Sequence, residues 1–192
     1  MAASFYVRAT YSNLSLMGRS ARTAGFTILE LLIVVAVVGI VTSLAVIGTR
    51  HARVRTAETA AVSALRTINQ AQFAFKQTCG HQSYAPTLVS LATPPPGSDS
   101  AFVSPDLAQS DPLQKSGYVF QMTGTAHPDA VAACNGGTTL SSYALTADPV
   151  NPGHSGIRSF GTNSDRVIFG DLTTYAGNMP ESGAPGHGLE IR

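Results

Sequence analysis

The sequence predicts an α+β fold in which one long N-terminal helix packs on a small antiparallel sheet. An almost purely apolar run occupies residues 26–49, and apolar residues at three- or four-residue steps continue through 50–78. Farther along the chain, short segments rich in apolar, β-branched and aromatic residues are separated by turn-forming residues. These observations place a helix first, then a loop, then the strands.

The apolar run 26–49 is long enough to cross a bilayer, because about 20 helical residues span about 30 Å of hydrocarbon. No residue from Leu31 to Thr49 carries a formal charge, and the single acid of the segment is Glu30. An ionised side chain in a transmembrane helix costs about 3 kcal/mol at the helix centre on insertion scales and usually marks function. We therefore expect a transmembrane helix over 26–49 in which Glu30 has a functional role.

The residues just before and within this run form a specific motif. A leader with three arginines and no acid ends at Gly25, and the stretch "GFTILELLIVV" places Phe26 next and Glu30 four residues later. This order resembles the processing site of type IV pilins and of the pseudopilins of type II secretion systems. A plain signal anchor with a chance glutamate is the alternative interpretation.

The resemblance implies that prepilin peptidase cuts between Gly25 and Phe26 on the cytoplasmic side and methylates the new amine of Phe26. Residues 1–25 are then a prepilin leader, and Met17 is an alternative start that gives a leader of the usual length. Because the cut precedes the apolar run, the helix stays with the mature protein.

The resemblance also implies a location and partners. The chain is expected to cross the bacterial inner membrane once, with its N-terminus in the cytoplasm and its head in the periplasm. It would then polymerise through residues 26–49 with identical or homologous pilin subunits, drawn from the lipid bilayer by an inner-membrane assembly platform. Glu30 would fix the register by pairing with the Phe26 amine of a neighbour, because an unpaired buried acid costs several kcal/mol. A pilus and a secretion pseudopilus both remain open.

The second half of the helix, residues 50–78, is predicted to be amphipathic and to back a globular head. Its apolar stripe contains Val54, Ala57, Ala61, Leu65, Ile68, Ala71 and Phe75. The polar residues that fall away from the stripe are Arg53, Glu58, Ser63, Arg66, Asn69 and Lys76. The helix is expected to stop near "TCGH", with Gly80 as its terminator.

The head is expected over residues 79–175, with an ordered, proline-rich loop followed by about four strands. The strand-like pieces are "GYVFQM", "SYALTA", "GIRSF" and "RVIFGD". The last two flank the turn-rich "GTNSD" and predict a hairpin. The segment 176–192 is rich in Gly and Pro and is expected to be a flexible tail.

Cys79 and Cys134 are the two cysteines of the chain, and both follow the apolar run. If that run lies in a membrane, both share one compartment, and an even pair outside the cytoplasm predicts a disulfide. Such a bridge could stabilise the head by about 4 kcal/mol in the chain-entropy model. Two buried reduced thiols are the alternative.

Other chemistries find little support in the sequence. The histidines are scattered without metal-binding spacing, at positions His51, His81, His127, His154 and His187. No calcium-loop pattern surrounds Asp165 or Asp171, and the residues around Ser155 lack the second glycine of a nucleophile elbow. We therefore expect no enzyme activity, no cofactor and no metal.

The charge pattern argues against nucleic acid as a partner. Charged residues make up 12% of the chain and the formal net charge is +1. A basic cluster after the apolar run contains Arg50, His51, Arg53 and Arg55, without interleaved aromatic residues. This cluster is typical of an interfacial anchor, and anionic lipid or another subunit could bind it.

Overall fold

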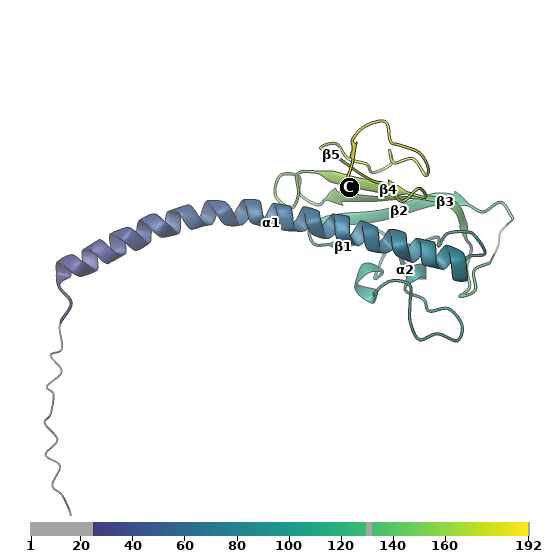
Figure 1. Ribbon diagram of the computed structural model, residues 1–192, viewed down its shortest axis with the longest axis horizontal. Helices are drawn as coiled ribbons and strands as arrows, with labels where there is room; N and C mark the ends of the chain where they lie inside the picture. Colours follow the sequence, from purple (N-terminus) through teal and green to yellow (C-terminus); the bar gives the residue numbers. More distant parts are fainter. Residues whose placement is uncertain (1–24, 130–131, 192) are drawn as a thin grey trace, which may run out of the picture. The chain divides into compact units, whose positions relative to one another are not determined.

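The computed structural model describes residues 25–129 and 132–191, with the side chains at 44–49 outside the description. The expected leader up to residue 24, including Met17, also lies outside the described residues. The chain divides into two compact units, Met1–Thr42 and Ser43–Arg192, and each is considered by itself. Helix α1 (Ile28–Thr78) contributes to both units (Figure 1).

The apolar part of α1 is helical in the structure from Ile28 onward. The polar group of Thr42 finds its hydrogen-bond partner within the helix, because its hydroxyl donates to the carbonyl oxygen of Val38 at 2.8 Å. Among the described residues, no helix combines the length and the apolar character needed to cross a membrane. The expected membrane span at 26–49 includes the undescribed side chains 44–49, and it stays a prediction.

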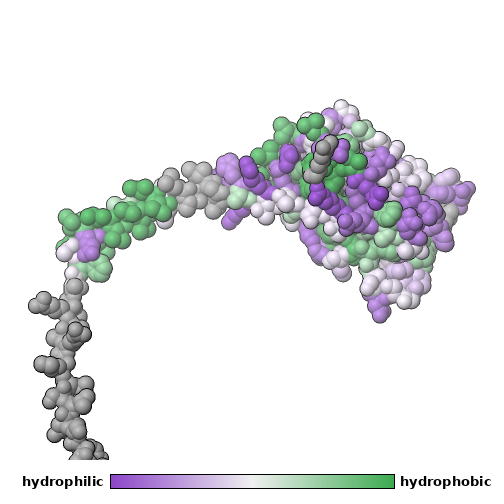
Figure 2. Space-filling view, in the orientation of Figure 1, coloured by the Kyte–Doolittle hydropathy of each residue, from purple (hydrophilic) through white to green (hydrophobic). Residues whose placement is uncertain are grey.

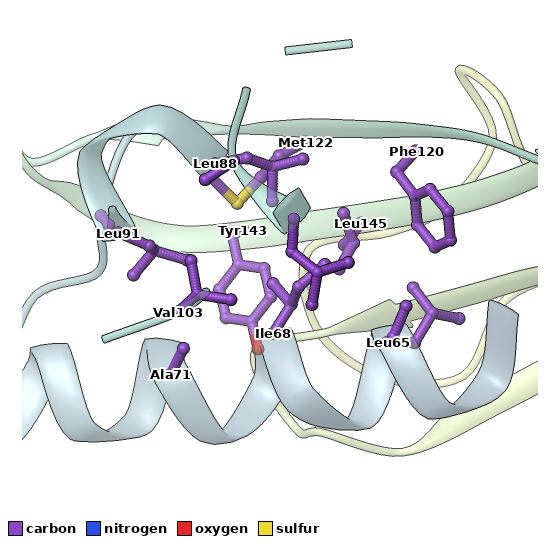
Figure 3. Packing of buried hydrophobic residues seen from close by; sticks show 14 of the residues in the cluster. Leu65, Ile68, Ala71, Leu88, Leu91, Val103, Phe120, Met122, Tyr143 and Leu145 are labelled. Atoms are coloured by element: carbon purple, nitrogen blue, oxygen red, sulfur yellow. The ribbon is translucent and has the colours of Figure 1, made fainter. Parts of the chain in front are cut away.

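Within the second unit, α1 packs along the sheet through the apolar stripe that the sequence predicts. Leu65, Ile68 and Phe75 are fully buried, and they share one core with residues of the strands. Figure 3 shows Leu65 and Ile68 of the helix lying toward side chains of the sheet. The α+β class is therefore confirmed, with a helix buried on one side and solvated on the other.

Helix α1 ends at Thr78, close to the predicted stop. The amides of Cys79 and Gly80 both donate to the carbonyl oxygen of Phe75, which closes the last turn. A Cβ on Gly80 would clash with the carbonyl oxygen of Ser83, so glycine permits this close approach of the backbone. The left-handed residue that follows is His81, with φ 49°, so the reversal comes one residue later than a glycine terminator predicts.

In the described part of the chain, the sheet has six antiparallel strands in sequential order, two more than expected. The strands are β1 (Leu113–Lys115), β2 (Tyr118–Ala126), β3 (Leu140–Pro149), β4 (Ser159–Asn163), β5 (Ile168–Asp171) and β6 (Leu189–Glu190). The predicted hairpin is present as β4 and β5, with Gly161 opposite Phe169. Strands β1 and β6 were not predicted, because strands of three and two residues carry too little periodic signal.

The loop between α1 and the sheet is ordered and contains α2 (Leu88–Leu91) and the 3-10 turn η1 (Pro105–Leu107). Thr87 and Ser90 form a reciprocal capping box at the start of α2. Asp111 fixes this loop to the sheet, because its carboxylate accepts hydrogen bonds from the amides of Leu88 and Met122.

The described part of the segment after Tyr175 differs from the flexible tail that its composition suggests. Leu189 pairs with Gly170 across β5 and β6, and Tyr175 is fully buried. The side-chain amide of Asn163 donates to the carbonyl oxygens of Pro180 and Gly183. Gly and Pro here build turns whose backbone groups find partners in the sheet, so the composition indicates tight turning and not disorder.

Candidate processing and assembly site

The bond between Gly25 and Phe26 lies outside the helix. Residues 25–27 belong to no helix or strand, and the Phe26 side chain is 79% exposed. A Cβ added to Gly25 would meet no atom within 4 Å, so the packing of the chain itself does not require glycine there. A requirement for glycine at this position would have to come from a protein that binds the segment.

Thr27 caps the first turn of α1. Its hydroxyl oxygen accepts a hydrogen bond from the Glu30 amide at 3.1 Å, which satisfies one of the free amides of the helix start. The spacing Thr27-x-x-Glu30 is that of a capping box. The capping role of Thr27 was not predicted, although this spacing in the sequence is a known signal for a helix start.

Glu30 lies in the first turn of α1 and is exposed. A carboxylate near a helix N-terminus is favourable, because the unpaired amides there carry partial positive charge. The assembly role of Glu30 stays a prediction.

The apolar side chains that follow are exposed on every face of the helix. Each large apolar side chain from Ile28 to Val41 is exposed, and Figure 2 shows this stretch in green. A helix that is apolar all round is stable only inside a membrane or a protein core. Another molecule or a bilayer must therefore cover this segment in the functional state.

Two polar residues on the head part of α1 anchor it to the sheet. Asn69 is buried, where it accepts a hydrogen bond from the Tyr143 hydroxyl at 3.0 Å and donates to the Thr162 hydroxyl at 2.8 Å. Gln72 is also buried. Its side-chain amide donates a hydrogen bond to the carbonyl oxygen of Ala85 and accepts one from the Ala85 amide. The expectation that Asn69 falls away from the buried stripe is therefore wrong, because its polar partners lie inside the core.

Glu58 is a third anchor, at the end of the head where α1 enters it. Its carboxylate accepts from the amides of Ile157 and Arg158 at 3.0 and 3.2 Å, and from the Arg158 guanidinium. The Glu58 side chain is only 12% exposed, so it also does not point away from the head as expected. Its partners lie 99 and 100 positions farther along the chain, which no periodicity of the helix could reveal.

The loop that Glu58 holds is also fixed by Tyr118. The Tyr118 hydroxyl donates to the carbonyl oxygen of Arg158 at 2.8 Å, and burial raises the pKa of Tyr118 well above its usual value. The hydroxyl therefore keeps its proton and remains a donor at physiological pH. A Cβ on Gly156 would clash with this hydroxyl, so the glycine allows the loop to approach Tyr118.

The structure contains the expected disulfide between Cys79 and Cys134. The amide of Cys134 also donates to the carbonyl oxygen of Cys79 at 3.0 Å. The bridge thus ties the C-terminal end of α1 to the segment that precedes β3. It closes a loop of 55 positions that contains β1 and β2.

The acids considered as calcium ligands have partners within the protein. Asp165 accepts from the Gly183 amide, and Asp171 accepts from the amide and hydroxyl of Thr173. The hydrogen bond from the Thr173 amide is the main reason that the pKa of Asp171 is lowered. Among residues 25–129 and 132–191, no three His, Cys, Asp or Glu side chains are placed to hold a metal ion.

Comparison with known protein families gives a match near the N-terminus. Residues 20–46 match the prokaryotic N-terminal methylation motif, which marks the prepilin peptidase substrates of the type IV pilin and pseudopilin family. The chain carries the signature of a type IV pilin-like protein. No curated protein matches it.

The match covers the expected cleavage site and most of the apolar segment of this chain. It includes Gly25, Phe26, Thr27 and Glu30, and it stops before the head. The motif implies processing by prepilin peptidase, assembly into pilin-like polymers, and a membrane-anchored protein. The α+β head lies outside the match.

Proposed function

We propose that this protein is a structural subunit of a type IV pilus-like fibre, without enzyme activity. In this proposal prepilin peptidase cuts after Gly25 and methylates Phe26, and the mature subunit waits in the inner membrane with its head in the periplasm. An assembly platform then moves it into a fibre held together by the apolar part of α1. The observation that carries the proposal is the methylation motif over residues 20–46.

Two features of the chain support this proposal. The glycine at position 25 has no packing role in the chain, as expected if a peptidase selects it. The apolar surface from Ile28 to Val41 is uncovered within the chain, as expected if neighbouring helices or lipid cover it.

Processing is the first test of the proposal. Mass spectrometry of the protein extracted from membranes should show an N-terminus at methylated Phe26. Gly25→Val should block cutting, because a branched side chain crowds the position where the peptidase takes glycine. Gly39→Val is a matched control, because Gly39 also has open space around it but lies inside the helix. An intact leader in a strain with active prepilin peptidase would contradict the family assignment.

A pseudopilin of a type II secretion system is the second candidate, because the same motif marks both kinds of protein. Deletion of the chain distinguishes the two. If wild-type cells carry surface fibres that contain this chain, and the deletion strain lacks these fibres, the result supports the pilus subunit. Loss of protein secretion with surface fibres intact supports the pseudopilin. A processed protein that is found in neither kind of fibre would be a membrane-anchored periplasmic protein that does not assemble.

A further inference from the structure

Three adjoining hollows in the second unit share the side chain of Arg158. Their volumes are about 410, 530 and 420 Å³, and α1, β5, β6 and the β3–β4 loop line them. The side chains of interest are Arg55, Ile157, Arg158, Leu172 and Leu189, which we call the Arg158 patch. Figure 2 shows apolar and polar residues side by side at this end of the head, near β5 and the C-terminus.

The patch contains the most exposed large apolar side chains of the described head. Ile157, Leu172 and Leu189 are 52%, 72% and 80% exposed. They come from three separate segments, namely the β3–β4 loop, the residue after β5, and β6. Isolated exposed apolar residues need no explanation, but Ile157 and Leu172 line one hollow and Leu172 and Leu189 line the hollow beside it, so the three together mark an interaction surface.

The segments that present these side chains are held in place by hydrogen bonds. Glu58 binds the backbone of Ile157 and Arg158, and pairing with Gly170 fixes Leu189. Asp171, next to Leu172, holds the following turn through the Thr173 amide. The apolar side chains are therefore exposed by rigid elements, so their exposure belongs to the folded head.

Three arginines and three acids line the hollows, and Arg50 and Arg53 earlier on helix α1 add two further positive charges, which favours an anionic partner. Arg158 remains 49% exposed although it pairs with Glu58, and Arg55 is exposed beside it. The acids at the patch are Glu58, which is mostly covered, Asp171, which binds Thr173, and Glu190. Arg50 and Arg53 precede Arg55 on the same helix. Cationic side chains with long apolar stems beside exposed leucines are typical of surfaces that bind phospholipid headgroups.

The position of the patch along α1 favours a bilayer over a soluble partner. The uncharged run ends at Thr49, and Arg55 and Glu58 follow it by about 9 and 14 Å along a helix axis at about 1.5 Å per residue. The headgroup layer on each side of a bilayer is about 5–8 Å thick. A membrane-anchored helix that leaves the hydrocarbon near Thr49 along the bilayer normal places Arg55 just outside this layer, from where its long side chain reaches back to the lipid phosphates. A tilt of the helix toward the patch brings the rest of the patch down to the headgroups.

We propose that the Arg158 patch docks the head on the surface of an anionic phospholipid bilayer before assembly. The arginines bind lipid phosphates, and Ile157, Leu172 and Leu189 insert at the boundary between headgroups and acyl chains. The proposal rests on the membrane anchor of the proposed function.

The absence of tryptophan from the chain allows a direct test. Leu172→Trp places a single fluorophore in the patch, and Val89→Trp places one at an exposed position of α2 as the control. Each full-length variant is reconstituted into vesicles of phosphatidylcholine alone or with phosphatidylglycerol, each with brominated acyl chains. We expect the bromines to quench the fluorescence of Leu172→Trp, more strongly in the anionic vesicles, and to leave that of Val89→Trp unaffected.

Charge variants in the Leu172→Trp protein test the arginines. Arg55→Gln should lower the ratio of docked to free head about fivefold, the equivalent of about 1 kcal/mol for one arginine near an anionic surface. Arg166→Gln is the matched control, because Arg166 is also exposed but lines none of the three hollows, so its replacement should have a weaker effect. High salt should reduce quenching in the same way, because it screens exposed charges.

Three results would overturn lipid docking. One is a Leu172→Trp protein that floats with the vesicles but is no more quenched than Val89→Trp. Another is quenching that is equal with and without anionic lipid. The third is a blue shift in the emission of Leu172→Trp that grows with protein density at fixed lipid composition, which assigns the patch to a second copy of the chain. A chain that fails to float with vesicles at all contradicts the membrane anchor instead, so the two failures are distinguishable.

Discussion

Glu58 and Arg158 join α1 to the β3–β4 loop across 100 positions of sequence. The Arg158 Nη2 and Nε atoms lie 3.2 and 3.3 Å from Glu58 Oε2, while Oε1 accepts from the amides of Ile157 and Arg158. One carboxylate thus satisfies two backbone donors and one guanidinium. The contact also positions the loop that carries the proposed lipid-docking residue Ile157.

The first prediction follows from the unequal roles of the two side chains. Glu58→Ala should lower the free energy of unfolding of the head by about 1–2 kcal/mol, because two backbone amides lose their acceptor. Arg158→Ala should cost about 0.5 kcal/mol, because the exposed ion pair is weak and the amides keep Glu58. The measurement is urea unfolding of the full chain in detergent, followed by near-ultraviolet circular dichroism. An equal loss of unfolding free energy in both variants would show that the ion pair holds the loop, and not the hydrogen bonds from the backbone amides to Glu58.

The sequence predicted the helix, its buried apolar stripe and the central strands, because each of these repeats a pattern along the chain. Leu65, Ile68 and Phe75 recur at helical spacing, and they are buried as predicted. The buried roles of Glu58 and Asn69 could not be found in this way. Their partners come from distant loops and strands, so tertiary contacts decide their burial, and the helical pattern carries no information about them.

The second prediction concerns Asn69, which bridges the Tyr143 and Thr162 side chains in the core. Asn69→Ala should lower the free energy of unfolding by about 2–3 kcal/mol, because the buried Tyr143 hydroxyl loses its acceptor. Gln70→Ala, a change at the exposed neighbouring position, should stay within about 0.5 kcal/mol. Urea unfolding gives both values.

A double-mutant cycle checks the source of that loss. Tyr143→Phe removes the donor, so Asn69→Ala should cost less in that background than in the wild type. Additive losses would contradict the assignment, since they would mean that Asn69 acts independently of Tyr143.

The third prediction is that the Cys79–Cys134 bridge forms in an oxidising envelope and stabilises the head. The extracted protein should have two fewer free thiols before reduction than after it. Replacing both cysteines by serine should lower the free energy of unfolding by about 4 kcal/mol, because the bridge closes a loop of 55 positions in the unfolded chain. Free-thiol labelling of both cysteines without prior reduction would show that the bridge is absent in the cell.

The fourth prediction is a pH dependence at Glu181. Partial burial opposes its charge, but hydrogen bonds from Ser142 and Thr125 outweigh burial and lower the pKa of Glu181 below its usual 4.5. A carboxylate with a lowered folded-state pKa stabilises the fold above its unfolded pKa and loses this contribution as the pH falls through the folded value. Glu181→Gln should therefore make the free energy of unfolding less sensitive to acid below about pH 4.5.

The ionisation of Asp111 affects the pH dependence of stability in the opposite direction to that of Glu181. Burial raises the pKa of Asp111, although the amides of Leu88 and Met122 partly offset this effect. Its contribution to stability is therefore present at low pH and is lost as the pH rises. The two groups are told apart by the Glu181→Gln variant. If its acid unfolding curve superimposes on that of the wild type, Glu181 is not a cause of the loss of stability in acid, and the fourth prediction is wrong.

The two candidate sites, one in each unit, were predictable to different extents. Gly25, Phe26 and Glu30 were predicted from the motif, because a motif for enzymatic processing is a pattern of residue types that does not depend on tertiary contacts. The Arg158 patch was not predictable, because the antiparallel pairing of β5 and β6 brings Leu189 beside residues of other segments. Its residues are unremarkable in the sequence.

Glu30 has two separable roles at the start of α1. Its amide takes part in the Thr27 cap, a backbone contact that any residue at this position could make. Its carboxylate is exposed in the single chain and is free to act between chains. Variants at Thr27 and Glu30 therefore separate the formation of the helix from the role of the charge.

The last prediction is that Glu30→Ala is inserted and cut but assembles poorly. After cleavage, the Phe26 amine of one subunit could pair with Glu30 of its neighbour, and an unpaired acid among apolar helices costs several kcal/mol. Removing the acid leaves apolar surfaces that pack in many registers, so fibre yield should fall while mature protein accumulates in the membrane. Thr27→Ala, which weakens the cap by about 1 kcal/mol and keeps the charge, should assemble far better. Normal fibres from mature Glu30→Ala, in a strain without the wild-type subunit, would show that the acid does not set the register.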